Sequence, residues 1–393
     1  MNNKLVVFVM LAVVTISALG DEFSELGSLR QLKFSADGKF ILAQDESAIV
    51  VLSAEPLGVL LRVRADKEVL GHFTPDSHQL VFVRSMIQVD PTQIRLMDGT
   101  PRVERWDVRD RMHVASSSIP NLVCGSVALA PDGGTLACDD MKGTLQVVDV
   151  KSGKVDFTKR KFARARVSVW ADQEVTVDSA NLWAADFEFS PDGRFLIAVP
   201  KDDGDAVIWD RREKGTLNAR GQVKMLSKMT ERAYFFAFLS PDRLAIARSR
   251  YVNSKKALEC DAVILKFPSG DVISTQHLPR CPGGYSVDFR RTTERLLRRA
   301  ADPKFLIITH EEIINGTIGD RNSWHHVVPP TGKSAKTRIE TSAVELSTGR
   351  MIGAGLHAVD IFGNRYVEDL RPGEIGLWER GKGLLGSVVV REK

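Results

Sequence analysis

Polar and aromatic side chains gather in three stretches that we expect to form loops between neighbouring strands. One stretch runs roughly from Arg84 to Pro101, a second from Arg248 to Leu258 and a third from His310 to Lys336. This mixture of groups favours an anionic or sugar-like ligand, or an extended peptide, held by stacking and charge-assisted hydrogen bonds. The candidate binding residues are Arg84, Arg250, Tyr251, Lys255, Lys256, His310, Glu311, Glu312, Arg321, Trp324, His325 and His326. A solvated insertion that binds nothing is the alternative, and it stays open.

Two stretches of this chain match catalytic or cofactor-binding motifs only in part. The stretch HEEII from His310 has Ile314 where a zinc protease has its second histidine. The stretch GAGLHA from Gly353 fits a dinucleotide fingerprint in spelling, but Gly363 follows soon after and would stop the helix that such a site needs. We therefore predict no catalytic residue, no metal site and no cofactor, and a binding protein in preference to an enzyme.

The elements that must position the loops repeat along the chain. The stretch VALAPDGGTLACDDMKGTLQVVDVKSGKV, residues 127–155, is an apolar run, a Pro-Asp-Gly turn, and two more apolar runs. Related stretches begin at Leu32, Phe73, Phe187 and Phe236, and more divergent copies begin at Ala301 and Leu356. Each copy predicts antiparallel strands joined by tight turns, and the copies recur at intervals of roughly 40–60 residues, as four-stranded blades with insertions would. The sequence therefore predicts an all-β fold, a single β-propeller of about seven four-stranded blades, with six or eight as alternatives.

The repeats resemble the blades of the WD-repeat-like and TolB-like β-propellers. Their pattern FSPDG…LA…I.VWD…G is matched best by residues 127–155 and 187–215. The resemblance covers nearly the whole mature chain and is specific for the fold, with exported bacterial propellers as the better comparison. The Gly-His dipeptide of true WD repeats is not at its usual place, since Gly71-His72 directly precedes Phe73. The buried His–Asp network of the eukaryotic family is therefore not implied.

Function in propellers usually belongs to loops at one end of the central channel. If the Pro-Asp-Gly turns join first to second strands, the loops between second and third strands all open on the opposite face. We expect a non-catalytic exported propeller that binds a protein or cell-envelope partner through this loop-rich face. The alternative is a propeller enzyme, a lactonase-like or glycan-cleaving hydrolase, in which His310, Glu311, Glu312 and His326 would converge at the channel mouth.

The N-terminal residues have the pattern of a secretory signal peptide. Lys4 precedes an apolar stretch from Leu5 to Leu19, and small residues stand before Asp21. That stretch is shorter than the ~20 residues of a membrane-spanning helix. We expect a cleaved signal peptide of residues 1–20 and a β-propeller domain of residues 21–393 without a transmembrane segment, secreted or periplasmic and monomeric.

The four cysteines form two pairs, each flanking a predicted turn. Cys124 and Cys138 surround a Pro-Asp-Gly-Gly turn, and Cys260 and Cys281 surround Pro-Ser-Gly-Asp. Antiparallel hairpins would bring each pair close enough to bridge, for about 3 kcal/mol each in the chain-entropy model. Two local disulfides are predicted, and zinc is disfavoured because no Cys-x-x-Cys spacing occurs.

The charge balance gives no general attraction to nucleic acid. Lys and Arg number 54 against 50 Asp and Glu, for a net charge of +4. Two basic clusters, between Arg160 and Arg166 and between Arg290 and Arg299, are predicted to lie on charged blade edges that resist aggregation. An acidic polymer as their partner is the alternative, and nucleic acid is not expected.

Closing the ring requires the first and last blades to meet. The segment from Phe23 to Leu32 is predicted to add a strand to the blade that contains Ser387 to Val390. Such a clasp would cover the apolar faces that an open ring exposes.

Overall fold

The computed structural model describes most of the chain between residues 29 and 390. The described residues are 29, 31–45, 48–64, 69–84, 100–120, 122, 124, 126–140, 143–162, 167–169, 175–177, 185–200, 206–218, 220, 223, 235–252, 257–282, 297–315, 317–318, 327–328, 336–355, 359–371 and 373–390. The predicted signal peptide and the basic residues Arg164, Arg166, Arg290, Arg291 and Arg295 lie outside them.

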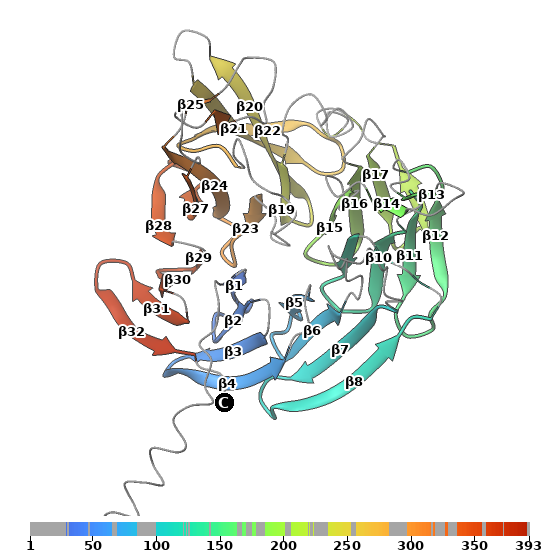
Figure 1. The fold of residues 1–393 in the computed structure, drawn as a ribbon, viewed down its shortest axis with the longest axis horizontal. Helices are drawn as coiled ribbons and strands as arrows, with labels where there is room; N and C mark the ends of the chain where they lie inside the picture. Colours follow the sequence, from blue (N-terminus) through green and yellow to red (C-terminus); the bar gives the residue numbers. More distant parts are fainter. Residues whose placement is uncertain are drawn as a thin grey trace, which may run out of the picture.

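Within these residues the chain forms seven four-stranded antiparallel sheets arranged as a ring, which confirms the predicted propeller (Figure 1). Blade 1 is β1 (Gln31–Phe34), β2 (Phe40–Gln44), β3 (Ala48–Ala54) and β4 (Leu57–Arg64). Blade 2 is β5 (Val69–Phe73), β6 (Gln79–Arg84), β7 (Arg102–Asp107) and β8 (Met112–Ser118). Blade 3 is β9 (Ser126–Leu129), β10 (Thr135–Asp139), β11 (Leu145–Asp149) and β12 (Val155–Lys159). Blade 4 is β15 (Ala185–Phe189), β16 (Phe195–Pro200), β17 (Val207–Asp210) and β18 (Gly215–Leu217).

The remaining blades carry the longest strands. Blade 5 is β19 (Phe235–Ser240), β20 (Arg243–Val252), β21 (Ala257–Lys266) and β22 (Val272–Leu278). Blade 6 is β23 (Leu297–Arg299), β24 (Phe305–Asn315), β27 (Lys336–Glu345) and β28 (Met351–Gly355). Blade 7 is β29 (Val359–Phe362), β30 (Arg365–Arg371), β31 (Glu374–Glu379) and β32 (Gly383–Val389). Two small pairs, β13 (Val167–Val169) with β14 (Val175–Val177) and β25 (Thr317–Ile318) with β26 (Val327–Val328), lie outside the blades.

The apolar core is divided among the interfaces between successive blades. Second strands are covered on both faces, so β16 is buried at every position and reads as a continuous apolar run. Fourth strands lie at the outside of the ring, and β32 has no buried residue. Because each blade is sandwiched between two neighbours, the packing of one interface depends on the residue sizes of both blades.

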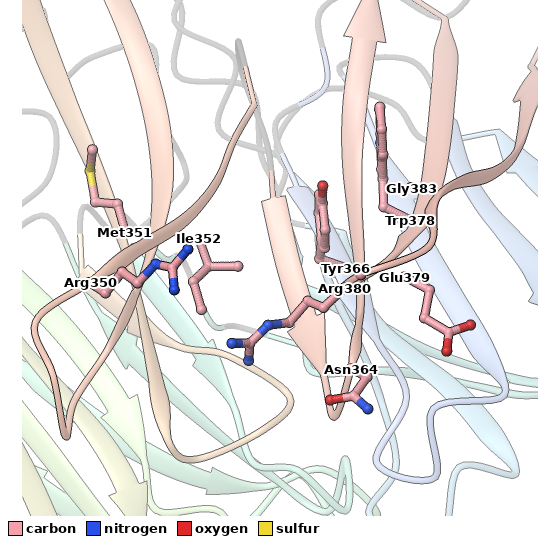
Figure 2. Close-up of a pocket in the computed structure, with 10 residues that line it drawn as sticks. Arg350, Met351, Ile352, Asn364, Tyr366, Trp378, Glu379, Arg380 and Gly383 are labelled. Carbon is pink, nitrogen blue, oxygen red and sulfur yellow. The ribbon is translucent and has the colours of Figure 1, made fainter.

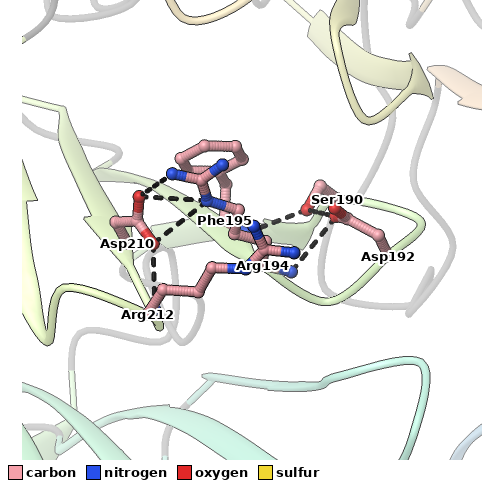
Figure 3. A network of polar contacts seen from close by, with 6 residues as sticks. All are labelled: Ser190, Asp192, Arg194, Phe195, Asp210 and Arg212. Carbon is pink, nitrogen blue, oxygen red and sulfur yellow. Dashed lines mark hydrogen bonds and ion pairs between the residues drawn. The ribbon is translucent and has the colours of Figure 1, made fainter.

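A hydrogen-bonded turn explains why the Ser-Pro-Asp-Gly motif repeats (Figure 3). In blade 4 the hydroxyl of Ser190 donates to Asp192 Oδ1 at 2.5 Å and accepts the backbone N–H of Phe195 at 2.9 Å. The same carboxylate oxygen accepts the N–H of Arg194 at 3.1 Å. The Arg194 side chain then pairs with Asp210, the last residue of β17, at 2.8 Å. The motif therefore fixes the turn and ties it to the third strand.

The same turn recurs around the ring. A hydroxyl donates to the turn carboxylate at 2.6–2.7 Å in three other blades, from Ser35 to Asp37, from Thr74 to Asp76 and from Ser240 to Asp242. These bonds favour the ionised carboxylate, and they hold the pKa of Asp76 and Asp242 below the ordinary value. Glycines of the motif have the expected positive φ, +69° at Gly38, +66° at Gly133 and +70° at Gly193.

Both predicted disulfides are present. Cys124 bonds to Cys138 with their Cα atoms 5.3 Å apart, and Cys260 bonds to Cys281 at 5.2 Å. Each joins a blade strand, β10 or β21, to the chain just before or just after its own blade. The bonds therefore fix connections between blades to the sheets that they leave or enter.

The predicted clasp is wrong for the part that the structure describes. Gln31 and Leu32 begin β1 and pair with β2 of their own blade, and Ser387 pairs with Gly376 within blade 7. Residues 23–28 lie outside the described residues. Blade 7 takes its four strands from consecutive segments of the chain. Side chains close the ring instead, in a buried cluster of Leu29, Leu32, Phe34, Ile41, Ala43, Ala48, Val50, Leu52, Ala54, Val367, Ile375, Leu377 and Val390.

One buried carboxylate joins three blades at this closure. Asp360 of β29 is fully buried, and its Oδ2 accepts the backbone N–H of Phe34 in blade 1 at 2.8 Å. Its Oδ1 accepts the N–H of Ala301, directly after β23 of blade 6, at 3.0 Å. The Arg298 guanidinium lies 4.0 Å from Asp360 and donates to the carbonyl of Val359 at 2.6 Å. Blades 6, 7 and 1 are therefore held by one set of polar contacts.

Replacing Ser190 with alanine should weaken the blade 4 turn, because the N–H of Phe195 and the carboxylate of Asp192 both lose a buried partner. We expect a loss of about 1–2 kcal/mol in the free energy of unfolding, measured by urea denaturation. Lys154→Ala, at an exposed turn position of blade 3, serves as the control and should leave stability unchanged. Equal stability of both variants would contradict the structural role of the hydroxyl.

Replacing Asp360 with leucine should destabilise the ring by about 2–5 kcal/mol, because two buried N–H groups lose their acceptor. Asp360→Asn should cost less, since its side-chain oxygen still accepts a hydrogen bond and burial raises the pKa of Asp360 rather than favouring its charge. Denaturant midpoints of the two variants and the wild type provide the measurement. If asparagine is as damaging as leucine, the carboxylate's charge, not its acceptor role, closes the ring.

Candidate functional site

Second and third strands of every blade are joined at the same face of the ring, as the sequence predicts. Consecutive antiparallel strands place the first and third turns of each blade on one face and the second connection on the other. Strands β20 and β21 have 10 residues each, and β24 and β27 have 11 and 10. In Figure 1 the β20–β21 hairpin lies at the top of the ring, and the β24–β27 hairpin lies below it on the left. We call the surface that they occupy the crossover face and the opposite surface the turn face.

Several predicted loop residues lie on strands. Arg250 and Tyr251 belong to β20, where they pair with Glu259 and Leu258 of β21. The other three, His310, Glu311 and Glu312, belong to β24 and pair with Glu340, Ile339 and Arg338 of β27. The expected loop bounds of blades 5 and 6 are therefore wrong, because the backbone ladder extends into both segments, to Val252 opposite Ala257 and to Asn315 opposite Lys336.

The remaining predicted residues divide into two groups. Arg84 ends β6, and its guanidinium pairs with Glu104 at 2.9 Å and donates to the carbonyl of Arg64 in blade 1 at 2.9 Å. Arg84 therefore links blades 1 and 2. The others lie outside the described residues, and they are Lys255, Lys256, Arg321, Trp324, His325 and His326.

Charged side chains from distant blades meet at the centre of the ring. The innermost strands include β1, β15, β23 and β29, which surround the axis in Figure 1. Lys33 of β1 interacts electrostatically with Glu188 of β15, with Arg298 and Arg299 of β23, and with Asp360 of β29. Arg298 and Arg299 do lie on an edge strand of blade 6, but it is the inner edge at the axis and not an outer edge that could meet another molecule.

Central side chains also bridge neighbouring blades. Glu188 accepts the backbone N–H of Phe238 in blade 5 at 3.1 Å. His72 of β5 lies 3.1 Å through its Nε2 from the carbonyl oxygen of Ala130 in blade 3. Burial, with Lys33 nearby, lowers the pKa of His72 to about 4, so its ring is neutral at physiological pH. These groups hold blades together at the axis.

A cleft opens between blades 6 and 7 on the turn face (Figure 2). Its volume is about 750 Å³, and its walls come from the β27–β28 turn with the start of β28, from β30, and from the β29–β30 and β31–β32 turns. The lining side chains that carry its chemistry are Arg350, Ile352, Asn364, Tyr366, Trp378 and Arg380. Sequence reasoning missed this site, although Trp378-Glu379 in place of Trp-Asp was a visible departure from the repeat.

The described residues give no sign of a metal site or of a membrane-spanning helix. They contain no group of three or more His, Cys, Asp or Glu placed to hold a metal ion. No helix among them is both long enough and apolar enough to cross a membrane.

Comparison with known proteins finds only distant structural likenesses. No family model matches the sequence, and no curated protein matches it. Hydrazine synthase of Kuenenia stuttgartiensis is similar in structure, with a TM-score of 0.48 and 10% identity over 91% of this chain and 97% of that chain. The β-propeller domain of Myceliophteria thermophila Cps50 (Swd1) has a TM-score of 0.42 and 12% identity over 82% of each chain. Likenesses at this level carry neither activity nor partner to this chain.

Replacing Lys33 with methionine should alter the pH dependence of stability in alkali. Burial, followed by repulsion from Arg299, lowers the pKa of Lys33 from 10.5 to about 8. Between these values the unfolded chain binds more protons than the folded chain, so Lys33 makes wild-type stability rise with pH across that window. The variant should lack this rise.

The measurement is the difference between the unfolding free energies of the two proteins, obtained by urea denaturation between pH 8 and 10.5. Titrating groups that both proteins share cancel in this difference. The wild type should gain stability relative to Lys33→Met as the pH increases. A constant difference would mean that the ammonium is solvated rather than buried at the axis.

Proposed function

We propose that this protein is a non-catalytic exported propeller of the WD-repeat-like and TolB-like type, which binds a protein or other cell-envelope partner through its crossover face. The proposal includes a cleaved signal peptide at residues 1–20 and a secreted or periplasmic location. Candidate contacts are the predicted residues of the two long hairpins, with Arg250, Tyr251, His310, Glu311 and Glu312 on their strands.

The observation that supports this proposal is the unequal length of the hairpins formed by the second and third strands of the blades. Hairpin β20–β21 keeps a paired register from Arg243 opposite Lys266 to Val252 opposite Ala257. Hairpin β24–β27 is paired from Phe305 opposite Glu345 to Asn315 opposite Lys336. Blade 3, by contrast, has second and third strands of 5 residues each. Long ladders hold a protruding surface in a defined conformation, which lowers the entropy lost when a partner binds.

The disulfides fit this proposal in both position and chemistry. Cys260 lies on β21 and bonds to Cys281 after β22, so one bridge ties a long hairpin to the outer part of blade 5. Disulfides persist in oxidising compartments, which agrees with export. Within the described residues no cysteine is free.

The test is a pull-down from cell-envelope extract with the mature chain, residues 21–393, immobilised through its C-terminus. A partner should be retained by the wild type and lost at least tenfold when Arg250→Ser and Tyr251→Ser are combined, since removing hot-spot contacts costs above ~1.4 kcal/mol. A second variant replaces residues 316–335 by a short Gly-Ser linker.

Arg109→Ala with Asp110→Ala, at the β7–β8 turn on the turn face, is the matched control and should keep the partner. Circular dichroism and unfolding midpoints establish that each variant is folded. Retention of every captured protein by both crossover-face variants would overturn the proposal.

A further inference from the structure

The cleft between blades 6 and 7 can be compared with the equivalent interfaces between other blades of the ring. A tryptophan occupies the same repeat position near the end of the third strand in blades 2, 4 and 7, as Trp106, Trp209 and Trp378. Trp209 is completely buried against blade 3. Trp378 instead lines the cleft. The preceding blade therefore covers the tryptophan of blade 4 and leaves the tryptophan of blade 7 facing a cleft.

The outer two strands of the preceding blade present side chains of different size in the two places. In blade 3, Val147 and its cross-strand partner Phe157 pack with the cluster that contains Trp209. The corresponding pair in blade 6 is Ala343 and Ile352. Both blade 6 side chains are smaller, so the face of blade 7 that they meet is filled less completely.

An apolar row crosses blade 7 on that face. Strand register places Ile361 opposite Tyr366, Tyr366 opposite Trp378, and Trp378 opposite Leu384. Ile361 is fully buried, whereas Leu384 is 46% exposed. The Tyr366 and Trp378 rings are parallel within 4°, with centroids 5.8 Å apart. The row therefore runs outward from the core as an apolar surface, and its two aromatic rings line the cleft.

Two guanidinium groups enter the cleft from its opposite walls. Arg350 comes from blade 6 and Arg380 from the β31–β32 turn of blade 7, and their side chains extend toward each other in Figure 2. Within the part of the chain that the structure describes, neither guanidinium has a hydrogen-bond or ion-pair partner. The nearby carboxylate of Glu379 is already paired with Lys382 at 2.8 Å. The cleft thus combines uncompensated positive charge with an aromatic wall.

We propose that this cleft binds an acidic peptide segment, with a carboxylate between Arg350 and Arg380 and an aromatic or apolar side chain against Tyr366 and Trp378. Guanidinium groups recognise carboxylates by paired hydrogen bonds, and the aromatic surface supplies burial. A neutral glycan would leave both guanidinium charges without a counter-charge, whereas an acidic peptide supplies one. Strand β28, which lines the cleft, pairs only with β27 among the described strands, so its other edge is open to an extended peptide.

This site is distinct from the partner surface proposed above, because it lies on the turn face, at the other end of blade 6 and on blade 7. Its ligand is recognised by negative charge together with an apolar group. The two proposals therefore succeed or fail separately.

The experiment measures binding of three polymers to the mature chain by isothermal titration calorimetry. They are a random Glu–Tyr copolymer, poly-glutamate of similar length, and polygalacturonate. The wild type should bind the Glu–Tyr copolymer most tightly, and added salt should weaken the binding. Combining Arg350→Ala with Arg380→Ala should reduce the affinity at least tenfold, as expected for lost charge-assisted hydrogen bonds.

Trp378→Leu should remove the preference for the Glu–Tyr copolymer over poly-glutamate while leaving binding of poly-glutamate in place. Arg109→Ala, an exposed arginine in the equivalent turn of blade 2, is the matched control and should bind like the wild type. Absence of wild-type binding, unchanged affinity in the double arginine variant, or tighter binding of polygalacturonate through the same arginines would overturn the proposal.

Discussion

The ring depends on a closure made by side chains rather than by a shared sheet. Asp360 is the central group of that closure, since it accepts backbone N–H groups from the blades on both of its sides. A carboxylate with no exposed surface is costly unless its oxygens are occupied, so its two acceptor bonds must be kept together. The surrounding apolar cluster, with Phe34 and Val367 from opposite ends of the chain, excludes the water that would compete. Every other interface can form from neighbours in sequence, whereas this one requires the whole chain to be in place.

Much of the architecture could be predicted because its determinants are local. The turn of blade 4 is specified by residues 190–195 alone, and a serine, an aspartate and a glycine at fixed spacing identify it in any sequence. The disulfides were predictable for the same reason, since each pair is close in sequence around a recognisable turn. Counting these units, together with two more divergent copies, predicted about seven blades, and the seven sheets confirm that number.

The features that could not be predicted depend on contacts between distant segments. Arg298 and Arg299 looked like surface charges because sequence does not reveal that β23 is innermost. The extent of β20 and β24 was underestimated because polar residues on a projecting hairpin resemble those of a loop. The cleft lies where Ile352 of blade 6 and Trp378 of blade 7 face the same space, and this juxtaposition exists only once the two blades are adjacent. Repeat patterns thus define the blades, and departures from the repeat define the sites.

The charges at the axis explain why binding is better sought at the rims than in the channel. Glu188 is engaged with the backbone of the next blade, and Asp360 with the backbones of two. A ligand that drew these groups away would break contacts that hold the ring, so binding there would be opposed by the stability of the fold. Lys33 already lies in a desolvated position where repulsion from Arg299 disfavours its charge. At the rims, by contrast, hairpins and turns can change length and charge without disturbing blade packing. The long hairpins of the crossover face and the arginines of the turn-face cleft are both changes of that kind.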